Sequence, residues 1–382
     1  MNYDIIVVGA GPVGCYTAKL IAEKGFSVAL IEEHPEIGYP VHCTGLVSSR
    51  VVELTNSKKA VIKEFRSAKI HSATKELFIE APKSRAFVLD RARFDKLLAK
   101  GALDKGVDLL LHTKVINAER MHDGTASVKI LKDGKKEDLK CNILIGADGA
   151  NSTVAKAFLL SRAKELLCGI NAEIAFDKEQ DYIDIFVTKN LAPNFFAWLI
   201  PLNSFAKIGL CTRTNTYLCF KKFLKLLNSE KLISFNAGII PFGLAKKTYT
   251  DNVMLVGNAA CHVKPLSGGG IYTGLVSAQH CAKVAISALE KGDYSAKVLK
   301  EYQKLWHSEL GRELKLGLLA RNVFKRLADK DFDSILANLN NSKTLALILE
   351  YGDLDYHSKI MKALLQAPQV TMLRYLLKGF FR

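Results

Sequence analysis

The sequence predicts an α/β fold that carries an α+β insert, and three observations support this class. A short apolar run at 4–8 leads directly into a glycine-rich turn at 9–14, which a helical pattern follows. A second apolar run at 27–31 ends on Glu32 and completes a β-α-β pattern with buried parallel strands. The middle of the chain alternates as antiparallel strands do, and helical patterns dominate after residue 294. We therefore expect a Rossmann-like domain, an antiparallel-sheet domain and C-terminal helices.

The turn Gly9-Ala-Gly11-Pro-Val-Gly14 has the spacing of a dinucleotide-binding loop. In such loops the first glycine allows the tight turn, the second lets the backbone approach a pyrophosphate, and the third lets helix and strand pack closely. The helix N-terminus also offers free N–H groups to the phosphates. Glu32 stands where an acid accepts the hydroxyls of an adenosine ribose, which argues against the 2′-phosphate of NADP. This stretch alone does not decide between NAD and FAD.

Length and composition limit the possible classes of protein. A chain of 382 residues predicts two or three domains, and 49% hydrophobic residues suffice for a large core. The sequence has no uninterrupted run of 18 apolar residues, so we expect no transmembrane helix. Asp4 and the glycine turn interrupt the apolar core that a signal peptide would need. The eight cysteines form no C-x-x-C pair and no zinc spacing, so we expect no metal site and a reducing, cytoplasmic setting.

The formal net charge of +16 has two explanations. It fits an anionic partner, which could be a nucleic acid, an acidic membrane surface or a phosphorylated substrate. It equally fits a proteome that is rich in lysine. No nucleic-acid-binding motif is present in the sequence, so we expect no nucleic-acid partner.

The segment from Glu33 to Arg50 predicts an irregular loop, as expected for a chain that runs along a bound cofactor. Cys43 in its middle is either a buried thiol or a thiol that faces a redox-active ring. Weak alternation over 60–87 predicts antiparallel strands of a second sheet. Asp90 is a candidate N-cap for a helix that continues to about residue 105.

The next elements lead to a second cluster of small residues. A strand is predicted at 107–111, and a hairpin is predicted around Asp133-Gly134. The hairpin leads into a buried strand that ends in Gly146-Ala-Asp148-Gly149, and Ser152 then begins a helix.

Residues 173–211 again predict strands, and they include an aromatic segment between Pro193 and Pro201. Phe196 and Trp198 in this segment form either ordinary sheet core or the apolar wall of a lipid-sized cavity. An amphipathic helix is predicted at 217–228.

A buried strand at 252–256 precedes Gly268-Gly269-Gly270, and a helix follows from Ile271 to about residue 290. Glycines directly before a helix again let backbone amides face a ligand. At the C-terminus, residues 358–382 hold five Lys or Arg and no acid. The part after Pro368 is either a basic amphipathic helix of the membrane-surface type or a terminal helix packed on its own domain.

Together these segments resemble the geranylgeranyl reductase family of flavoproteins, and most closely the archaeal digeranylgeranylglycerophospholipid reductases. This family lies within the larger group of p-hydroxybenzoate hydroxylase-like enzymes. The more specific similarities are the cysteine loop at 40–46, the aromatic segment at 193–201 and the glycines at 268–270. Phe196 replaces the family's tyrosine, and Asn258 replaces its aspartate.

The resemblance implies that the cofactor is FAD, with the pyrophosphate on the 9–14 turn and the adenosine ribose on Glu32. It places Gly270 and Ile271 at the pyrimidine edge of the flavin, where a helix N-terminus stabilises negative charge on the reduced ring. The cofactor-binding residues that it implies are Gly9, Gly11, Val13, Gly14, Glu32, Cys43, Thr44, Arg91, Val115, Asp148, Asn258, Gly269, Gly270 and Ile271.

The implied activity is saturation of isolated double bonds in the prenyl chains of a lipid, with Phe196 and Trp198 as substrate-binding residues. Cys43 and His262 are the candidate catalytic residues. No second nucleotide-binding turn is present, so the electron donor is open between NADPH, a ferredoxin and a deazaflavin. The implied location is the cytoplasm, peripheral on the inner face of the cell membrane. Two alternatives stay open: a flavin-dependent monooxygenase of the same fold, and a prenyl-lipid carrier without catalysis.

We predict three parts of the chain. The FAD-binding domain comprises 1–60, 86–157 and 246–295. The substrate-binding sheet domain comprises 61–85 and 158–245, and the C-terminal helical region comprises 296–382.

Overall fold

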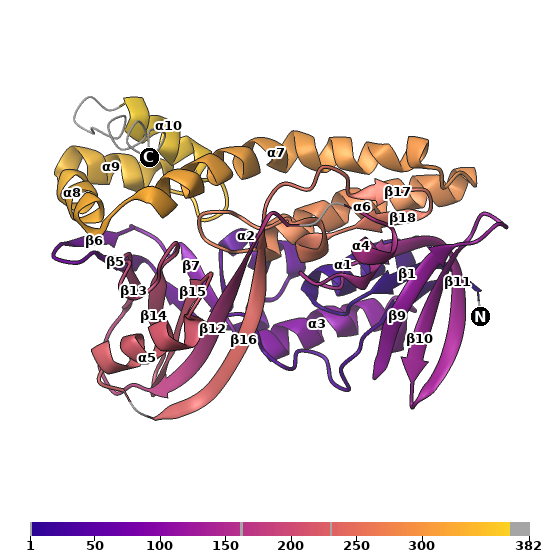
Figure 1. The fold of residues 1–382 in the computed structure, drawn as a ribbon, viewed down its shortest axis with the longest axis horizontal. Coiled ribbons are helices and arrows are strands. Elements are labelled where there is room, and N and C mark those ends of the chain that lie inside the picture. Colours follow the sequence, from indigo (N-terminus) through magenta and orange to yellow (C-terminus); the bar gives the residue numbers. More distant parts are fainter. Residues whose placement is uncertain (1, 161–162, 230, 367–382) are drawn as a thin grey trace.

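The computed structural model describes residues 2–160, 163–229 and 231–366. Two large sheets lie next to one another along the molecule, and one long helix runs across both of them (Figure 1). The predicted α/β fold with an antiparallel sheet and C-terminal helices is confirmed. The basic segment after Pro368 lies outside the described residues.

The first sheet has eight strands and a parallel centre. Its main order is β17-β18-β11-β1-β2-β8, and β9 and β10 extend it through β11. β1 pairs in parallel with both β2 and β11, which confirms the predicted β-α-β unit. The strands are β1 (Asn2–Val8), β2 (Val28–Ile31), β8 (Asp108–Leu110), β9 (Thr113–Arg120), β10 (Ala126–Lys132), β11 (Lys135–Gly146), β17 (Tyr249–Thr250) and β18 (Val253–Leu255).

Apolar side chains cover both faces of this sheet, as expected for parallel strands. Ile5 and Val7 face one core together with helices α1 (Pro12–Ala22), α3 (Arg91–Leu103) and α6 (Ile271–Lys291). Ile6 and Val8 point to the opposite core beside α4 (Thr153–Ala157). Successive side chains of β1 are therefore buried on alternate faces.

Local sequence signals place several element ends correctly. The side chain of Asp90 accepts a hydrogen bond from the Arg93 amide, and Ser152 accepts one from the Ala155 amide. Asp133 and Gly134 both have left-handed φ values, +49° and +77°, in the turn between β10 and β11. This pair of conformations is typical of a tight hairpin turn, and Asp-Gly supplies it at low cost.

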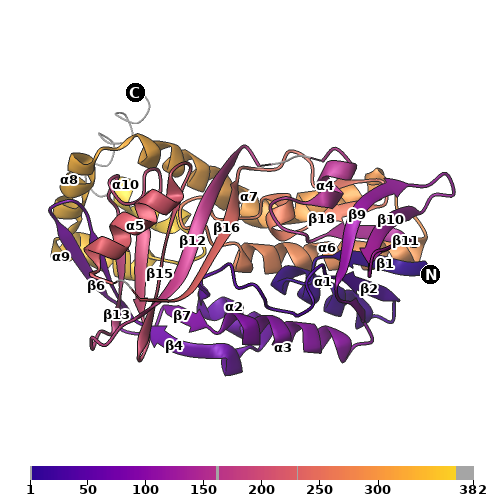
Figure 2. The ribbon, with the colours of Figure 1, turned by 60° about the horizontal axis from the view of Figure 1, so that its bottom comes forward.

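The second sheet has seven strands in the order β16-β12-β15-β14-β13-β5-β6. Helix α5 (Thr216–Leu226) covers one face of it (Figure 2). The strands are β5 (Ser67–His71), β6 (Glu76–Glu80), β12 (Glu165–Ala175), β13 (Tyr182–Phe186), β14 (Ala197–Pro201), β15 (Phe205–Thr212) and β16 (Leu232–Phe242).

The expectation of a single second sheet over 60–87 is wrong for part of that segment. β4 (Val61–Phe65) pairs with β7 (Ala86–Leu89), and β7 pairs with β3 (Leu46–Val47), in a separate three-stranded sheet. Only β5 and β6 join the large sheet. Alternation predicts a strand but not its partner, because pairing is decided by distant segments. The domain boundaries stay a prediction.

The C-terminal helices connect the two sheets. Trp306 of α7 (Ala296–Arg326) donates to Thr248 Oγ1 beside the first sheet at 3.0 Å, and Arg321 pairs with Glu165 of the second sheet at 3.1 Å. The remaining helices are η1 (Lys58–Ala60), α2 (Ser49–Thr55), η2 (Gly257–Ala260), α8 (Asp329–Leu339), α9 (Ser342–Tyr351) and α10 (Ser358–Gln366). None of the helices in the described ranges combines the length and apolarity that crossing a bilayer requires.

Helices α1 and α6 approach each other closely around Val13. A Cβ atom added to Gly274 of α6 would lie 2.5 Å from Val13 Cγ2, and one added to Gly257 would lie 3.3 Å from the same side chain. Valine is stiff at χ1, so it cannot rotate away easily. The two glycines therefore permit a contact that any other residue would widen.

We expect Gly274→Ala to destabilise the protein by about 1–3 kcal/mol, because the added methyl group overpacks this contact. Gly101→Ala is the matched control, since Gly101 is also a helical glycine but its Cβ would meet only Lys19 at 3.6 Å. That control should gain about 0.5–1 kcal/mol from helix propensity. Urea unfolding of the FAD-free proteins measures both changes, and equal effects of the two substitutions would contradict the proposed crowding.

Candidate functional site

The first glycine turn has the geometry that its sequence predicts. Gly9 has φ of +99°, and its Cβ would lie 2.6 Å from the carbonyl oxygen of Ala147. A Cβ on Gly14 would lie 1.9 Å from the carbonyl oxygen of Gly9. Gly11 differs, because nothing lies within 4 Å of its Cβ position. Gly9 and Gly14 therefore serve the fold, while Gly11 leaves open space beside the start of α1.

The amides at the start of α1 are available to a ligand. Gly11 is the N-cap residue and provides no side-chain cap, and proline occupies the first turn. An uncapped helix N-terminus carries free N–H groups and a partial positive charge, which favour a pyrophosphate. Glu32 borders this turn, because its Oε2 accepts from the Ala10 amide at 2.8 Å and its Oε1 accepts from the His34 amide at 3.0 Å.

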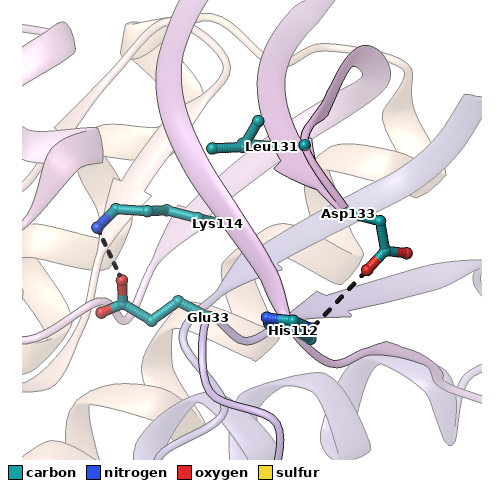
Figure 3. Close-up of a pocket in the computed structure, with 6 residues that line it drawn as sticks. Glu33, His112, Lys114, Leu131 and Asp133 are labelled. Carbon is teal, nitrogen blue, oxygen red and sulfur yellow. Dashed lines mark ion pairs between the residues drawn. The ribbon is translucent and has the colours of Figure 1, made fainter.

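A pocket of about 370 Å³ is lined by Glu33, which follows Glu32 in the chain at the predicted adenosine end (Figure 3). Lys114 pairs with Glu33 at 3.2 Å on one side of the pocket, and His112 pairs with Asp133 at 3.8 Å on the other. Val115 follows Lys114 on β9 and is buried. No sequence pattern indicates this pocket, because its walls come from three separate segments.

The second glycine segment forms the N-terminus of α6. Gly270 is the N-cap residue of this helix and provides no side-chain cap. The side chain of Asn258 lies at the helix start, since a Cβ on Gly270 would be 2.7 Å from Asn258 Oδ1. A Cβ on Gly269 would lie 2.9 Å from Lys264 Cε. Lys264 itself is held by the buried carboxylate of Asp355 at 2.8 Å.

Asp148 carries a buried acceptor that lacks a protein partner. Its Oδ2 accepts from the Thr153 and Val154 amides at 2.7 and 3.2 Å. Its Oδ1 is buried, and no hydrogen-bond partner exists for it within the described residues. Burial raises the pKa of the Asp148 carboxyl, although hydrogen bonds from its neighbours oppose the shift. An orphaned buried oxygen is costly unless a ligand or water satisfies it, so this atom points to a ligand site.

The fold brings these three segments together. Gly9 packs against Ala147, which directly precedes Asp148. Gly257, which directly precedes Asn258, packs against Val13. Segments that are far apart in the sequence therefore border one site, in which two uncapped helix N-termini are available.

The cysteine loop lies against the second sheet and the start of α3. Thr44 donates to Asn171 Oδ1 at 3.1 Å, and a Cβ on Gly238 would lie 3.3 Å from His42 Cβ. The thiol of Cys43 is partly exposed and interacts with Arg91. Arg91 also pairs with Asp95 at 3.0 Å; burial opposes its charge, but Asp95 and Cys43 raise its pKa.

Lys207 is a buried residue beside the cysteine loop that the sequence pattern does not indicate. It lies on β15 with only 4% of its surface exposed, and burial lowers the pKa of its amine. Its Nζ donates to the carbonyl oxygens of Thr44 at 3.2 Å and Leu89 at 3.4 Å. A lysine in a strand pattern usually indicates the solvent face, so no sequence signal distinguishes this one.

The aromatic segment borders the second glycine segment. Phe195 and Phe196 stack with ring centroids 4.3 Å apart, and a Cβ on Gly268 would lie 3.2 Å from Phe195 Cζ. Trp198 covers Gly209, whose Cβ would lie 2.3 Å from Trp198 Cζ2. Phe195 therefore contacts the second glycine segment directly, and the predicted substrate residues Phe196 and Trp198 follow it in one aromatic cluster.

Comparison with known proteins agrees with this geometry. A model of the FAD binding domain family matches residues 2–207. Digeranylgeranylglycerophospholipid reductase 2 of Methanothermobacter thermautotrophicus is 30% identical over 98% of this chain and 99% of its own length. The chain belongs to the digeranylgeranylglycerophospholipid reductase family. Uncharacterized protein MJ1520 of Methanocaldococcus jannaschii is 33% identical over 95% of this chain and 96% of its own length.

Solved structures support the same fold. A geranylgeranyl bacteriochlorophyll reductase-like protein of Thermoplasma acidophilum superposes with a TM-score of 0.86 at 24% identity. That similarity covers 98% of this chain and 99% of the other. The myxobacterial chondrochloren halogenase CndH has a TM-score of 0.70 at 16% identity and covers 99% of this chain and 97% of its own. At such identities these structures show the fold alone.

FAD is the cofactor of this family member, which resolves the choice between NAD and FAD. The residues present fit it: Gly11 leaves room at an uncapped helix N-terminus, and Asp148 Oδ1 offers a buried acceptor. Glu32 keeps acceptor capacity at the adenosine end. The contacts of individual residues with FAD stay a prediction.

His262, one of the two candidate catalytic residues, is fully buried and packs on Trp306 with ring centroids 4.6 Å apart. Neither ring nitrogen has a partner within the described residues. Burial lowers the pKa of His262 to about 3. The ring is therefore neutral at pH 7 and cannot supply a proton as an imidazolium, so Cys43 is the better candidate of the two.

We expect Gly11→Ala to lower FAD content while leaving the FAD-free chain folded, because a methyl group there enters the ligand space and touches no protein atom. Gly14→Ala is the contrasting variant, since its methyl group collides with the Gly9 carbonyl oxygen and should lower the thermal midpoint of the FAD-free protein as well. Absorbance near the flavin bands and thermal unfolding measure the two effects. Full FAD content in Gly11→Ala would contradict the assignment.

We also expect His262 to make the protein sensitive to acid. In the unfolded chain His262 takes up a proton below about pH 6.5, whereas in the folded chain it stays neutral down to about pH 3. The free energy of unfolding therefore decreases as the pH falls through this range. Between pH 7 and 4.5, the free energy of unfolding of His262→Phe should decrease by about 2–3 kcal/mol less than that of the unsubstituted protein. Urea unfolding at both pH values measures this, with the exposed His122→Phe as control. Equal losses in all three proteins would exclude the effect.

Proposed function

We propose that this chain is an FAD-dependent reductase that saturates the isolated double bonds of geranylgeranyl chains in an archaeal glycerophospholipid. The observation that carries this proposal is the near full-length similarity to reductases that are named for this substrate. The aromatic segment next to Gly268 supports it, because an apolar wall beside the cofactor suits a prenyl chain.

Saturation of one double bond breaks a π bond and forms two C–H bonds, so it takes one hydride and one proton. FAD, when bound and reduced, supplies the hydride. The backbone amides at the start of α6 would stabilise negative charge at the pyrimidine edge of the ring. Phe195, Phe196 and Trp198 would exclude water from the reacting chain.

We assign the proton to the Cys43 thiol. Its Sγ would protonate one alkene carbon while the hydride goes to the more substituted carbon. The thiolate would then regain a proton from water. The guanidinium of Arg91 beside Cys43 would stabilise that thiolate. Lys207 and Asn171 would hold the loop in place through Thr44.

The substrate and the electron donor define the setting that we propose. A membrane lipid as substrate places the protein peripherally on the inner face of the cell membrane. The electrons would come from NADPH, a deazaflavin or a donor protein such as a ferredoxin. Each of these would reach the flavin from outside, since no second nucleotide-binding turn is present in the sequence.

The decisive experiment is anaerobic incubation of the FAD-loaded protein with dithionite and unsaturated archaeal lipids, followed by mass spectrometry. Each reduced double bond should add about 2 Da. Turnover without oxygen would exclude a monooxygenase, and a reducible flavin that drives turnover would exclude a simple carrier. No mass gain on any prenyl lipid, with the flavin fully reduced, would overturn the proposal.

We expect Cys43→Ala to retain FAD and to lose at least about tenfold in turnover, which is the smaller part of a typical general-acid contribution. Cys168→Ala is the matched control, since that thiol is also partly exposed but lies on β12. Single-turnover oxidation of the reduced flavin by the lipid measures the step directly. Full turnover in Cys43→Ala would exclude the thiol as proton donor.

A further inference from the structure

An exposed apolar surface lies on α5 and the neighbouring edge strand β16. We call it the α5–β16 face. Seventeen large apolar side chains are exposed among the described residues, and seven of them lie within 217–239. They are Tyr217, Leu218, Leu226, Leu232, Ile233, Phe235 and Ile239, with 41–60% of their surface exposed.

Strand pairing places the β16 residues Leu232, Phe235 and Ile239 on the side of the sheet that α5 covers. Phe235 is paired with Ala172, whose side chain belongs to the core beneath α5. The ring of Phe235 also packs edge-to-face on the ring of Phe220 of α5, with ring centroids 5.6 Å apart. Because side chains alternate along a strand, Ile239 points to the same side as Phe235. Figure 2 shows α5 on this outer side of the sheet.

The charge of this region is strongly one-sided. Residues 185–250 contain nine Lys or Arg and a single acid, Glu230. Three of these lysines, Lys221, Lys222 and Lys225, are exposed on α5 itself. Apolar and aromatic side chains beside a cluster of lysines are typical of a surface that lies on an anionic bilayer.

β16 also connects this face to the site. It is the edge strand of the seven-stranded sheet, so no neighbouring strand of that sheet covers its free side. Its alternate residue Gly238 points to the opposite face and packs against His42 of the cysteine loop. A lipid chain that leaves a bilayer at this edge would pass around the free edge of a single strand, β16, to reach the site.

We propose that the α5–β16 face docks the protein on an anionic phospholipid bilayer. The apolar side chains enter the interface, and the lysines of α5 contact the lipid headgroups. The inference rests on the proposed function only for the identity of the lipid that is reduced. Binding to a bilayer is a separate property and can be measured without any substrate.

The test is flotation of the full-length, FAD-loaded protein with vesicles of phosphatidylcholine, alone or with about 30% phosphatidylglycerol. We expect binding to the anionic vesicles that weakens as salt is added. The combined variant Lys221→Gln, Lys222→Gln and Lys225→Gln should bind at least about tenfold more weakly, since each lysine contributes about 1 kcal/mol near an anionic surface. The matched control replaces the exposed Lys132, Lys135 and Lys136 of the β10–β11 hairpin by Gln.

A second pair of variants tests the apolar contribution. Leu218→Ser combined with Ile233→Ser should also bind at least about tenfold more weakly. Leu103→Ser on α3, combined with Leu159→Ser, removes two exposed leucines elsewhere and should leave binding unchanged. Thermal unfolding of all four variants confirms that each chain stays folded.

Three results would overturn the proposal. Equal loss of binding in the α5 lysine variant and its hairpin control would mean that net charge alone attracts the protein. Full binding in the α5 lysine variant would assign bilayer contact to another segment. Dimers in solution that the Leu218→Ser, Ile233→Ser variant dissociates would identify a second copy of the chain as the occupant. Vesicle binding without reduction of any lipid would instead contradict the proposed function and leave this surface in place.

Discussion

The contact between α1 and α6 around Val13 is the constraint on which the site depends. Each helix begins at a glycine segment with an uncapped N-terminus, and Gly257 and Gly274 let the two helices approach within contact of one valine. A wider spacing would move Asn258 and the start of α6 away from the 9–14 turn. The predicted FAD site spans both helix starts, so this contact would set the distance between its two ends.

The C-terminal helices hold that arrangement against the second sheet. Trp306 of α7 bonds to Thr248 on the FAD-binding side, and Arg321 of the same helix pairs with Glu165 and lies 4.0 Å from the ring centroid of Phe242. Lys264, next to the second glycine segment, pairs with Asp355 beyond α9. Buried charges are costly unless they are paired, so these contacts define a specific position for each element.

The seven-stranded sheet divides two roles between its faces. Its inner face carries Lys207, Gly209 and Gly238, which contact the cysteine loop or Trp198. Its outer face carries α5 and the exposed apolar side chains of β16. A lipid reductase needs both a dry slot at the flavin and access to a bilayer, and an edge strand with two different faces can provide both.

The sequence by itself determined the local features: the β-α-β unit, the glycine turn, the Asp90 and Ser152 caps and the Asp133-Gly134 hairpin. These depend on residues close in sequence, whose conformational preferences are specific. Resemblance extended this to FAD and to the family. Only the tertiary structure decided that β4 pairs in the small sheet and not the large one, and that β16 exposes an apolar face. It also decided that Lys207 is buried and that His262 is buried and uncharged. A strand or helix pattern shows which side chains share a face, but what covers that face comes from distant segments through packing.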